Sequence, residues 1–136
     1  MYDHIIVPID FDHDALVKQG LDVANRLLSD GGNITLVHVI DDIPGYVATS
    51  LPEGVIRNKT TASEAAITKL ATAYGANCTG VVRNGNPSRE IVTLAKKTDA
   101  GCIIMASHKP GLQDYFLGST AARVVRHAKC AVHVVR

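Results

Sequence analysis

The sequence has no tryptophan, few other aromatic residues and almost no excess of charge. Its formal net charge is +1, so no overall field draws the chain to nucleic acid or to an anionic membrane. No apolar run approaches the roughly 20 residues that a membrane-spanning helix needs. The first residues lack the basic and apolar regions of a secretory signal. We therefore expect a cytoplasmic protein that binds neither nucleic acid nor membranes.

Cysteine is scarce as well, with three residues at Cys78, Cys102 and Cys130. They are widely spaced and form no CxxC or His/Cys cluster, so the sequence predicts neither a zinc site nor a redox pair. Each lies in or beside an apolar run. This placement favours buried free thiols in a reducing compartment.

Aliphatic residues and alanine are abundant instead, and 46% of the 136 residues are hydrophobic. This length fits one domain over residues 1–136. Several apolar runs are nearly continuous, as strands are when helices cover both faces of a sheet. Runs rich in β-branched residues predict strands at 4–9, 33–40, 78–83, 102–106 and 131–135.

Segments with helical periodicity lie between the predicted strands. We expect Gly31-Gly32 to end the first helix, and Asn86-Pro87, a capping residue before proline, to begin the third. Residues 41–61 hold two prolines and two glycines and predict one long irregular connection. The apolar stripes of the four predicted helices fall within 16–28, 62–74, 91–95 and 121–128.

Four strand–helix repeats closed by a fifth strand predict a doubly wound α/β fold. Its open parallel five-stranded sheet would have right-handed crossovers, helices on both faces and a Rossmann-like architecture. In such sheets ligands bind beyond the carboxyl ends of the strands, where the strand order reverses. This rule points to the loops at 8–12 and 106–119.

The second of these loops has the residues of an anion site. Gly118, Ser119 and Thr120 lead into a helix, whose first N–H groups and positive dipole end attract phosphate. His108 and Lys109 would add positive charge. The alternative is that Ser119 only caps its helix, and the local spacing alone does not separate the two interpretations.

Asp10 ends the first predicted strand, where its carboxylate would bind a ribose hydroxyl or lie near a phosphate-bound magnesium ion. Alternatively it caps the first helix, a role that Asp12 or Asp14 would also fill. Ser107 and His108 are adjacent, and neighbours rarely bring a hydroxyl and an imidazole into productive contact. No third catalytic member is identifiable, so the sequence specifies no reaction and leans away from an enzyme.

With these residues described, the chain resembles the universal stress protein family over essentially its whole length. The resemblance lies in IIVPID at 5–10, LVHVI at 36–40, GNP at 85–87 and VVRHA at 124–128, in that order. In many members the last strand–loop–helix carries G-x2-G-x9-G-[ST] and binds ATP. Gly118 and Ser119 match its end, whereas Ala106 and Lys109 replace its first two glycines and the loop is one residue shorter.

The sequences ASHKPG at 106–111 and YFLGS at 115–119 are similar to one branch of small bacterial members, which includes nucleotide binders. The resemblance implies ATP as the ligand, with Mg²⁺, and Lys109 would supply charge in place of a missing glycine contact. Contacts to adenosine would come from Pro8, Asp10 and Val39. Contacts to ribose and phosphates would come from Ala106, Ser107, His108, Lys109, Gly118, Ser119 and Thr120.

The family also forms dimers through its last strand. Here Ala131–Val135 would be an edge strand of high β-propensity, and antiparallel pairing with its copy would remove an aggregation-prone edge. We therefore expect a homodimer, and the sequence leaves open whether dimers pair into tetramers. It also leaves open whether residues 41–61 cover the site as a lid.

Three functions follow, in order of preference. The first is an ATP-binding regulatory protein of the stress response, with the nucleotide as ligand rather than substrate. The second is a dimeric interaction scaffold without nucleotide, for which Ala106 and the shortened loop argue. The third is a slow ATPase, for which no base or second acidic group is identified.

Overall fold

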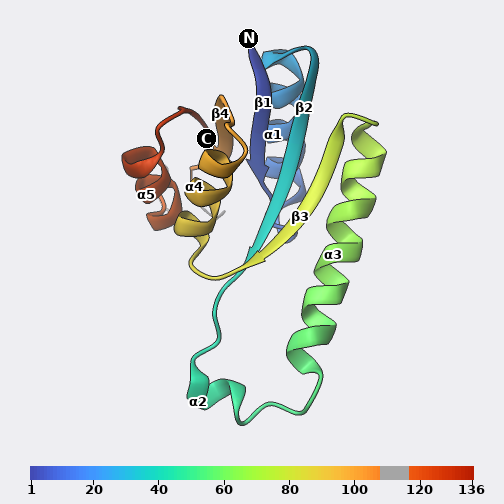
Figure 1. Ribbon diagram of the computed structural model, residues 1–136, viewed down its shortest axis with the longest axis vertical. Helices are drawn as coiled ribbons and strands as arrows, with labels where there is room; N and C mark the ends of the chain where they lie inside the picture. The colour runs from blue at the N-terminus through green and yellow to red at the C-terminus, as the bar shows by residue number, and fades with distance from the viewer. Residues whose placement is uncertain (108–116) are drawn as a thin grey trace.

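The computed structural model has an α/β fold and describes residues 1–107 and 117–136 (Figure 1). Its five strands form one parallel sheet in the order β3-β2-β1-β4-β5, which confirms the predicted fold class. The strands are β1 (Tyr2–Pro8), β2 (Leu28–Ile40), β3 (Cys78–Asn84), β4 (Cys102–Ala106) and β5 (Ala131–Val135). The helices are α1 (Asp14–Leu27), α2 (Gly45–Ala48), α3 (Val55–Tyr74), α4 (Pro87–Lys97) and α5 (Ser119–His127).

The sheet has an apolar core on each face. One core joins β1 to α1 and α3 through buried residues such as Ile5, Leu21 and Ile67. The other joins the same strand to α4 and α5 through residues such as Ile6 and Val124. Alternate residues of β1 therefore belong to opposite cores, which explains why its sequence is apolar on both faces.

The end of α1 differs from the prediction. The helix stops at Leu27, because Leu28 has extended backbone angles (φ −73°, ψ 133°) and already belongs to β2. Gly31 and Gly32 therefore lie in a bulged lead-in to β2 rather than at a helix end, since the pairing with β1 shifts register before Asn33. Gly31 has a φ of 77°, a value that glycine adopts readily.

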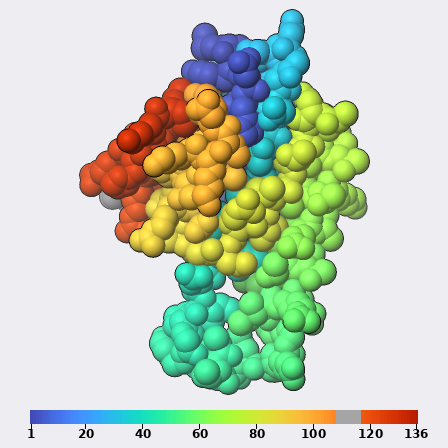
Figure 2. Space-filling view, viewed as in Figure 1, coloured from blue at the N-terminus to red at the C-terminus, as the bar shows by residue number. Residues whose placement is uncertain are grey.

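The predicted irregular connection at 41–61 is wrong in part. It contains the one-turn helix α2, and α3 begins at Val55, so the second helix starts earlier than its apolar stripe indicated. The stripe did not mark the start because α3 buries only Ile67 and Ala71, both in its second half. α2 and the start of α3 project as an arm from the sheet edge at which β2 ends (Figures 1 and 2).

Other local predictions agree with the structure. Asn86 caps α4, and its side-chain oxygen accepts a hydrogen bond from the Arg89 N–H (3.1 Å). All three cysteines are free thiols; Cys78 and Cys102 are buried and Cys130 is half-buried. Desolvation by burial raises the pKa of each of these thiols. They therefore act as packing residues rather than as reactive nucleophiles.

Candidate functional site

The strand order reverses between β1 and β4. From β1 the chain builds outward through β2 to β3, and on the other side it builds from β4 to β5. β1 and β4 pair in parallel, with Ile6 beside Ile103, so their carboxyl ends meet at the same edge of the sheet. The two loops selected from the sequence therefore follow the two strands that flank this switch point.

Side-chain alternation puts three of the predicted ligand residues on the same face of the sheet. Ile6, Val37 and Met105 all belong to the core under α4 and α5. Pro8 and Val39 lie two positions further along β1 and β2 and therefore face α4 and α5 as well. Ser107 directly follows β4, and its N–H still bonds to the Val135 carbonyl of β5, so the same alternation places it on this face. Ala106 alternates to the opposite face. A ligand beside α5 can therefore contact the backbone of Ala106 but not its side chain.

Asp10 lies just beyond β1 and shapes the turn that leads into α1. Its carboxylate accepts the Asp12 N–H (3.1 Å) and lies 3.7 Å from the His13 ring nitrogen Nε2. The N-cap residue of α1 is His13, which makes no side-chain cap hydrogen bond. The alternative of an aspartate cap is therefore wrong, and the half-exposed carboxylate of Asp10 keeps acceptor capacity for a ligand.

Ser107 closes the base of the second loop. Its carbonyl oxygen accepts the Gly118 N–H (2.6 Å), and its own N–H donates to the Val135 carbonyl (2.8 Å). The start of α5 is thereby held against the ends of β4 and β5. Ser107 is only 2% exposed, so the residue that joins these elements is buried. The predicted residues His108 and Lys109 lie outside the described part of the chain.

The start of α5 has the electrostatics of an anion site. Its N-cap residue is Gly118, which has no side chain to occupy the first amides, and its first turn contains no acidic residue. Ser119 is the first helical residue and is exposed, so it is not the cap that the alternative interpretation required. Together with Thr120 it leaves hydroxyls beside the positive end of the helix dipole, as phosphate binding requires.

At this site a magnesium ion would find the carboxylate of Asp10 as a ligand. Within residues 1–107 and 117–136, no group of three His, Cys, Asp or Glu side chains forms a metal site. Asp10 is the acidic residue at the switch point, and one carboxylate with phosphate oxygens is a common setting for Mg²⁺. The chain's residues thus fit a nucleotide-borne ion.

Two residues near the switch point were not predicted to act together. The ring nitrogen Nδ1 of His38 donates to the Ile9 carbonyl (2.9 Å), and its ring lies 4.8 Å from that of Phe11. This pair lies on the α1 face and locks the first loop to β2. In the sequence, His38 is only a polar residue within an apolar strand. That pattern does not show that its ring contacts Ile9 and Phe11.

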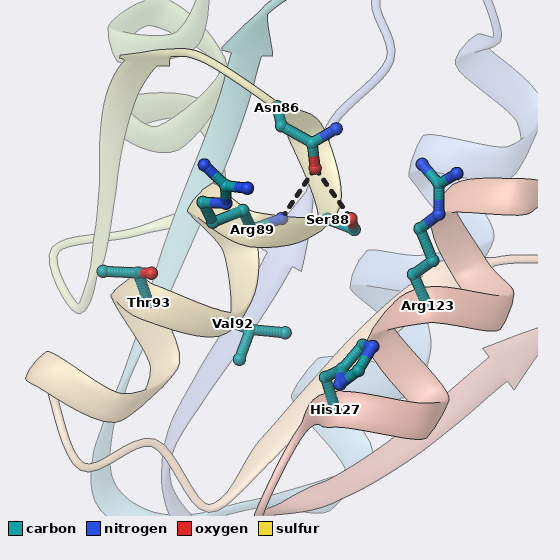
Figure 3. A pocket seen from close by; sticks show the side chains of 7 residues that line it. All are labelled: Asn86, Ser88, Arg89, Val92, Thr93, Arg123 and His127. Carbon is teal, nitrogen blue, oxygen red and sulfur yellow. Dashed lines mark hydrogen bonds between the residues drawn. The ribbon is translucent and has the colours of Figure 1, made fainter.

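The structure also contains a groove that the sequence did not reveal. It lies between α4 and α5, has a volume of about 410 Å³ and includes none of the predicted ligand residues that the structure describes (Figure 3). Within the described ranges, no helix combines the length and apolar character needed to cross a bilayer.

These features are those of a doubly wound α/β protein with a candidate ligand site at its topological switch point. The model of the universal stress protein family matches residues 1–136, and the chain belongs to this family. Universal stress protein G of Salmonella typhimurium is 31% identical over 145 residues, covering 100% of both chains. The universal stress protein UspA structure from Lactobacillus plantarum is 25% identical, with a TM-score of 0.72 over 99% of this chain and 98% of that one.

More distant structures share the fold. A universal stress protein from Archaeoglobus fulgidus in complex with dAMP is 18% identical, with a TM-score of 0.64 over 99% of this chain and 98% of that one. A universal stress protein in complex with cAMP is 19% identical, with a TM-score of 0.62 over 99% and 97%. At these identities the likeness shows the fold, and the nucleotides are properties of those two proteins.

Proposed function

We propose that this protein binds ATP, with Mg²⁺, as a regulatory ligand at the β1–β4 switch point. One observation carries the proposal: Pro8, Val39 and Ser107 face the same side of the sheet, where α5 begins. The apolar side chains of Pro8 and Val39 suit an adenine ring, and the amides of α5 suit phosphates. The two nucleotide complexes of the same fold support adenine nucleotides as the ligand class.

In this proposal the chain's residues bind and position the nucleotide. Asp10 accepts from the ribose hydroxyls, and Ser119 and Thr120 donate to phosphate oxygens. Ser107 sets the distance between the ends of β4 and α5 through its two backbone hydrogen bonds. His108, Lys109 and the backbone of Ala106 complete the site. The protein would act in the stress response, in the cytoplasm.

A thermal-shift measurement with Mg-ATP tests this site. A ligand at 100 times its Kd stabilises the native state by about 2.7 kcal/mol, so wild-type protein should melt at a higher temperature. Gly118→Val should remove the shift, because it places a side chain before the first amides of α5 at a residue whose φ of −57° does not require glycine. Gly45→Val is the matched control, since a Cβ there meets nothing within 4 Å at the start of α2.

The outcomes separate the three candidate functions. Nucleotide released from denatured protein, together with an ATP shift that Gly118→Val abolishes, supports the proposal. Neither co-purified nucleotide nor a shift would contradict it and favour the nucleotide-free scaffold. Phosphate release that disappears in Gly118→Val would favour the slow ATPase. An equal loss of the shift in Gly45→Val would show that the effect is not local.

We also propose that the protein forms a homodimer through β5. This strand lies at the sheet edge, with β4 as its neighbour. Ala131 donates inward to the Gly101 carbonyl (3.3 Å), and Val135 accepts inward from Ser107, so Val132 and Val134 direct their backbone groups outward. The strand contains neither proline nor charge to block a second copy.

Val134→Pro tests the dimer because it removes an outward N–H and leaves the hydrogen bonds to β4 intact. Wild-type protein should sediment as a dimer and the variant as a monomer with an unchanged circular dichroism spectrum. A dimeric Val134→Pro would contradict pairing through β5. Sedimentation of the wild type also shows whether dimers pair into tetramers.

A further inference from the structure

The groove between α4 and α5 is lined by two pairs of side chains, one pair from each helix (Figure 3). Arg89 and Thr93 come from α4, and Arg123 and His127 come from α5. Each pair has the i, i+4 spacing that stacks side chains on one face of a helix. Val92 lies between the pairs and packs on the core below, so the groove has an apolar floor and polar walls.

The described side chains on the walls of the groove are hydrogen-bond donors, and none of them is a carboxylate. Arg89 and Arg123 contribute two positive charges, His127 adds a third when protonated, and no Asp or Glu of residues 1–107 and 117–136 lines the groove. Neither guanidinium forms an ion pair with any residue in the described part of the chain. Thr93 adds a hydroxyl that has no hydrogen-bond partner there. Among the described residues, the positive charges of this groove therefore have no acidic partner.

The start of α4 lies at one end of the groove but is not the source of this charge. The side-chain oxygen of Asn86 accepts from the Arg89 N–H (3.1 Å) and from the Ser88 hydroxyl (2.8 Å), so the helix already has its cap. The Asn86 amide N–H₂ has no partner among the described residues and adds another donor. The attraction for an anion therefore comes from side chains.

We propose that this groove binds a phosphate-bearing small molecule, at a site separate from the nucleotide site at the switch point. Arginine forks fit phosphate oxygens in two-pronged hydrogen bonds, and each wall of the groove supplies one. The volume of about 410 Å³ exceeds that of a single phosphate group and falls in the range of small-molecule pockets. The proposal does not depend on nucleotide binding, because the groove shares none of the described residues of that site.

Titration calorimetry with inorganic pyrophosphate tests the groove. Replacing both arginines in Arg89→Gln/Arg123→Gln should weaken binding by about tenfold per guanidinium, roughly 100-fold in all. Arg57→Gln/Arg126→Gln is the matched control with the same net charge. Arg126 lies on α5 without lining the groove, and Arg57 lies on α3. The control should change the affinity less than twofold.

Several outcomes would overturn the proposal. They are an absence of pyrophosphate binding and an equal loss of affinity in the control pair. Amide chemical shifts that move in the first turn of α5 rather than along α4 and the end of α5 would also contradict it. Should the arginine pair fail to fold, Thr93→Glu places a negative charge in the groove and should abolish binding; retained affinity would refute the location.

Discussion

Two glycines at different helix–sheet contacts should respond to the same substitution with opposite signs. Gly20 lies inside α1 and is buried against the sheet. A Cβ at this position would lie 3.7 Å from Val7 Cγ1 and 3.9 Å from Ile104 Cγ2, which is ordinary van der Waals contact. Replacing a glycine in a helix interior by alanine gains about 0.5–1 kcal/mol. Gly20→Ala should therefore stabilise the protein.

Gly80 in β3 has no such room. Its Cβ would lie 2.8 Å from the carbonyl oxygen and 2.9 Å from the carbonyl carbon of Ile67, which are backbone atoms of α3 and cannot rotate away. The helix must move off the sheet, and overpacking of this kind costs about 1–3 kcal/mol. Gly80→Ala should therefore destabilise the protein by that amount.

Urea denaturation followed by circular dichroism measures both changes in the free energy of unfolding, and heating the same samples gives their melting temperatures. At about 3–5 °C per kcal/mol for a domain of this size, the melting temperature should rise by a few degrees in one variant and fall in the other. The two glycines lie at different helix–sheet contacts and share no neighbour, so the free-energy change of the double variant should equal the sum of the two single changes to within about 0.5 kcal/mol. A destabilised Gly20→Ala, or a Gly80→Ala as stable as wild type, would refute the packing described for these positions.

Three further expectations concern the cap of α4 and the buried thiols. Asn86→Ala should lower the free energy of unfolding by about 1 kcal/mol, and Asn86→Asp should retain most of it, because either oxygen accepts the Arg89 N–H; equal losses in urea titrations would contradict the cap. Iodoacetamide should modify native Cys78 and Cys102 far more slowly than urea-unfolded protein, and fast native labelling would disprove their burial. Because burial raises the pKa of both thiols, the stability from their neutral forms is fully present below the unfolded pKa of about 8.5 and is lost as pH rises through the folded pKa. Urea midpoints should fall between pH 8 and pH 10, more steeply than in a Cys78→Ala variant.

Much of the fold follows from local patterns in the sequence. The bounds predicted for β4 and β5 agree with the structure, and so does the start of α4 after Asn86. Strand periodicity, an N-cap before proline and β-branched residues act within a few positions of the chain. The switch point also followed from sequence, because the order of strands and helices restricts the topology of a parallel sheet.

The missed features depend on contacts between distant segments. α1 ends at Leu27 because β2 begins pairing with Tyr2 at Leu28, and nothing local to Leu28 signals that partner. The first half of α3 lies beyond the core, so no apolar stripe marked its start.

At the site from 107 to 120, too, some features follow from local sequence and others depend on contacts between distant segments. The sequence determined its glycine, its hydroxyls and its place before a helix, because these are chemical properties of neighbouring residues. Only the tertiary structure decided that Ser107 is buried and bonded to Gly118, and that Ala106 faces away from α5. Only packing, too, brought Arg89 and Arg123 to opposite walls of one groove. Helices from two different crossovers meet through the core they share, and no local pattern in the chain records that meeting.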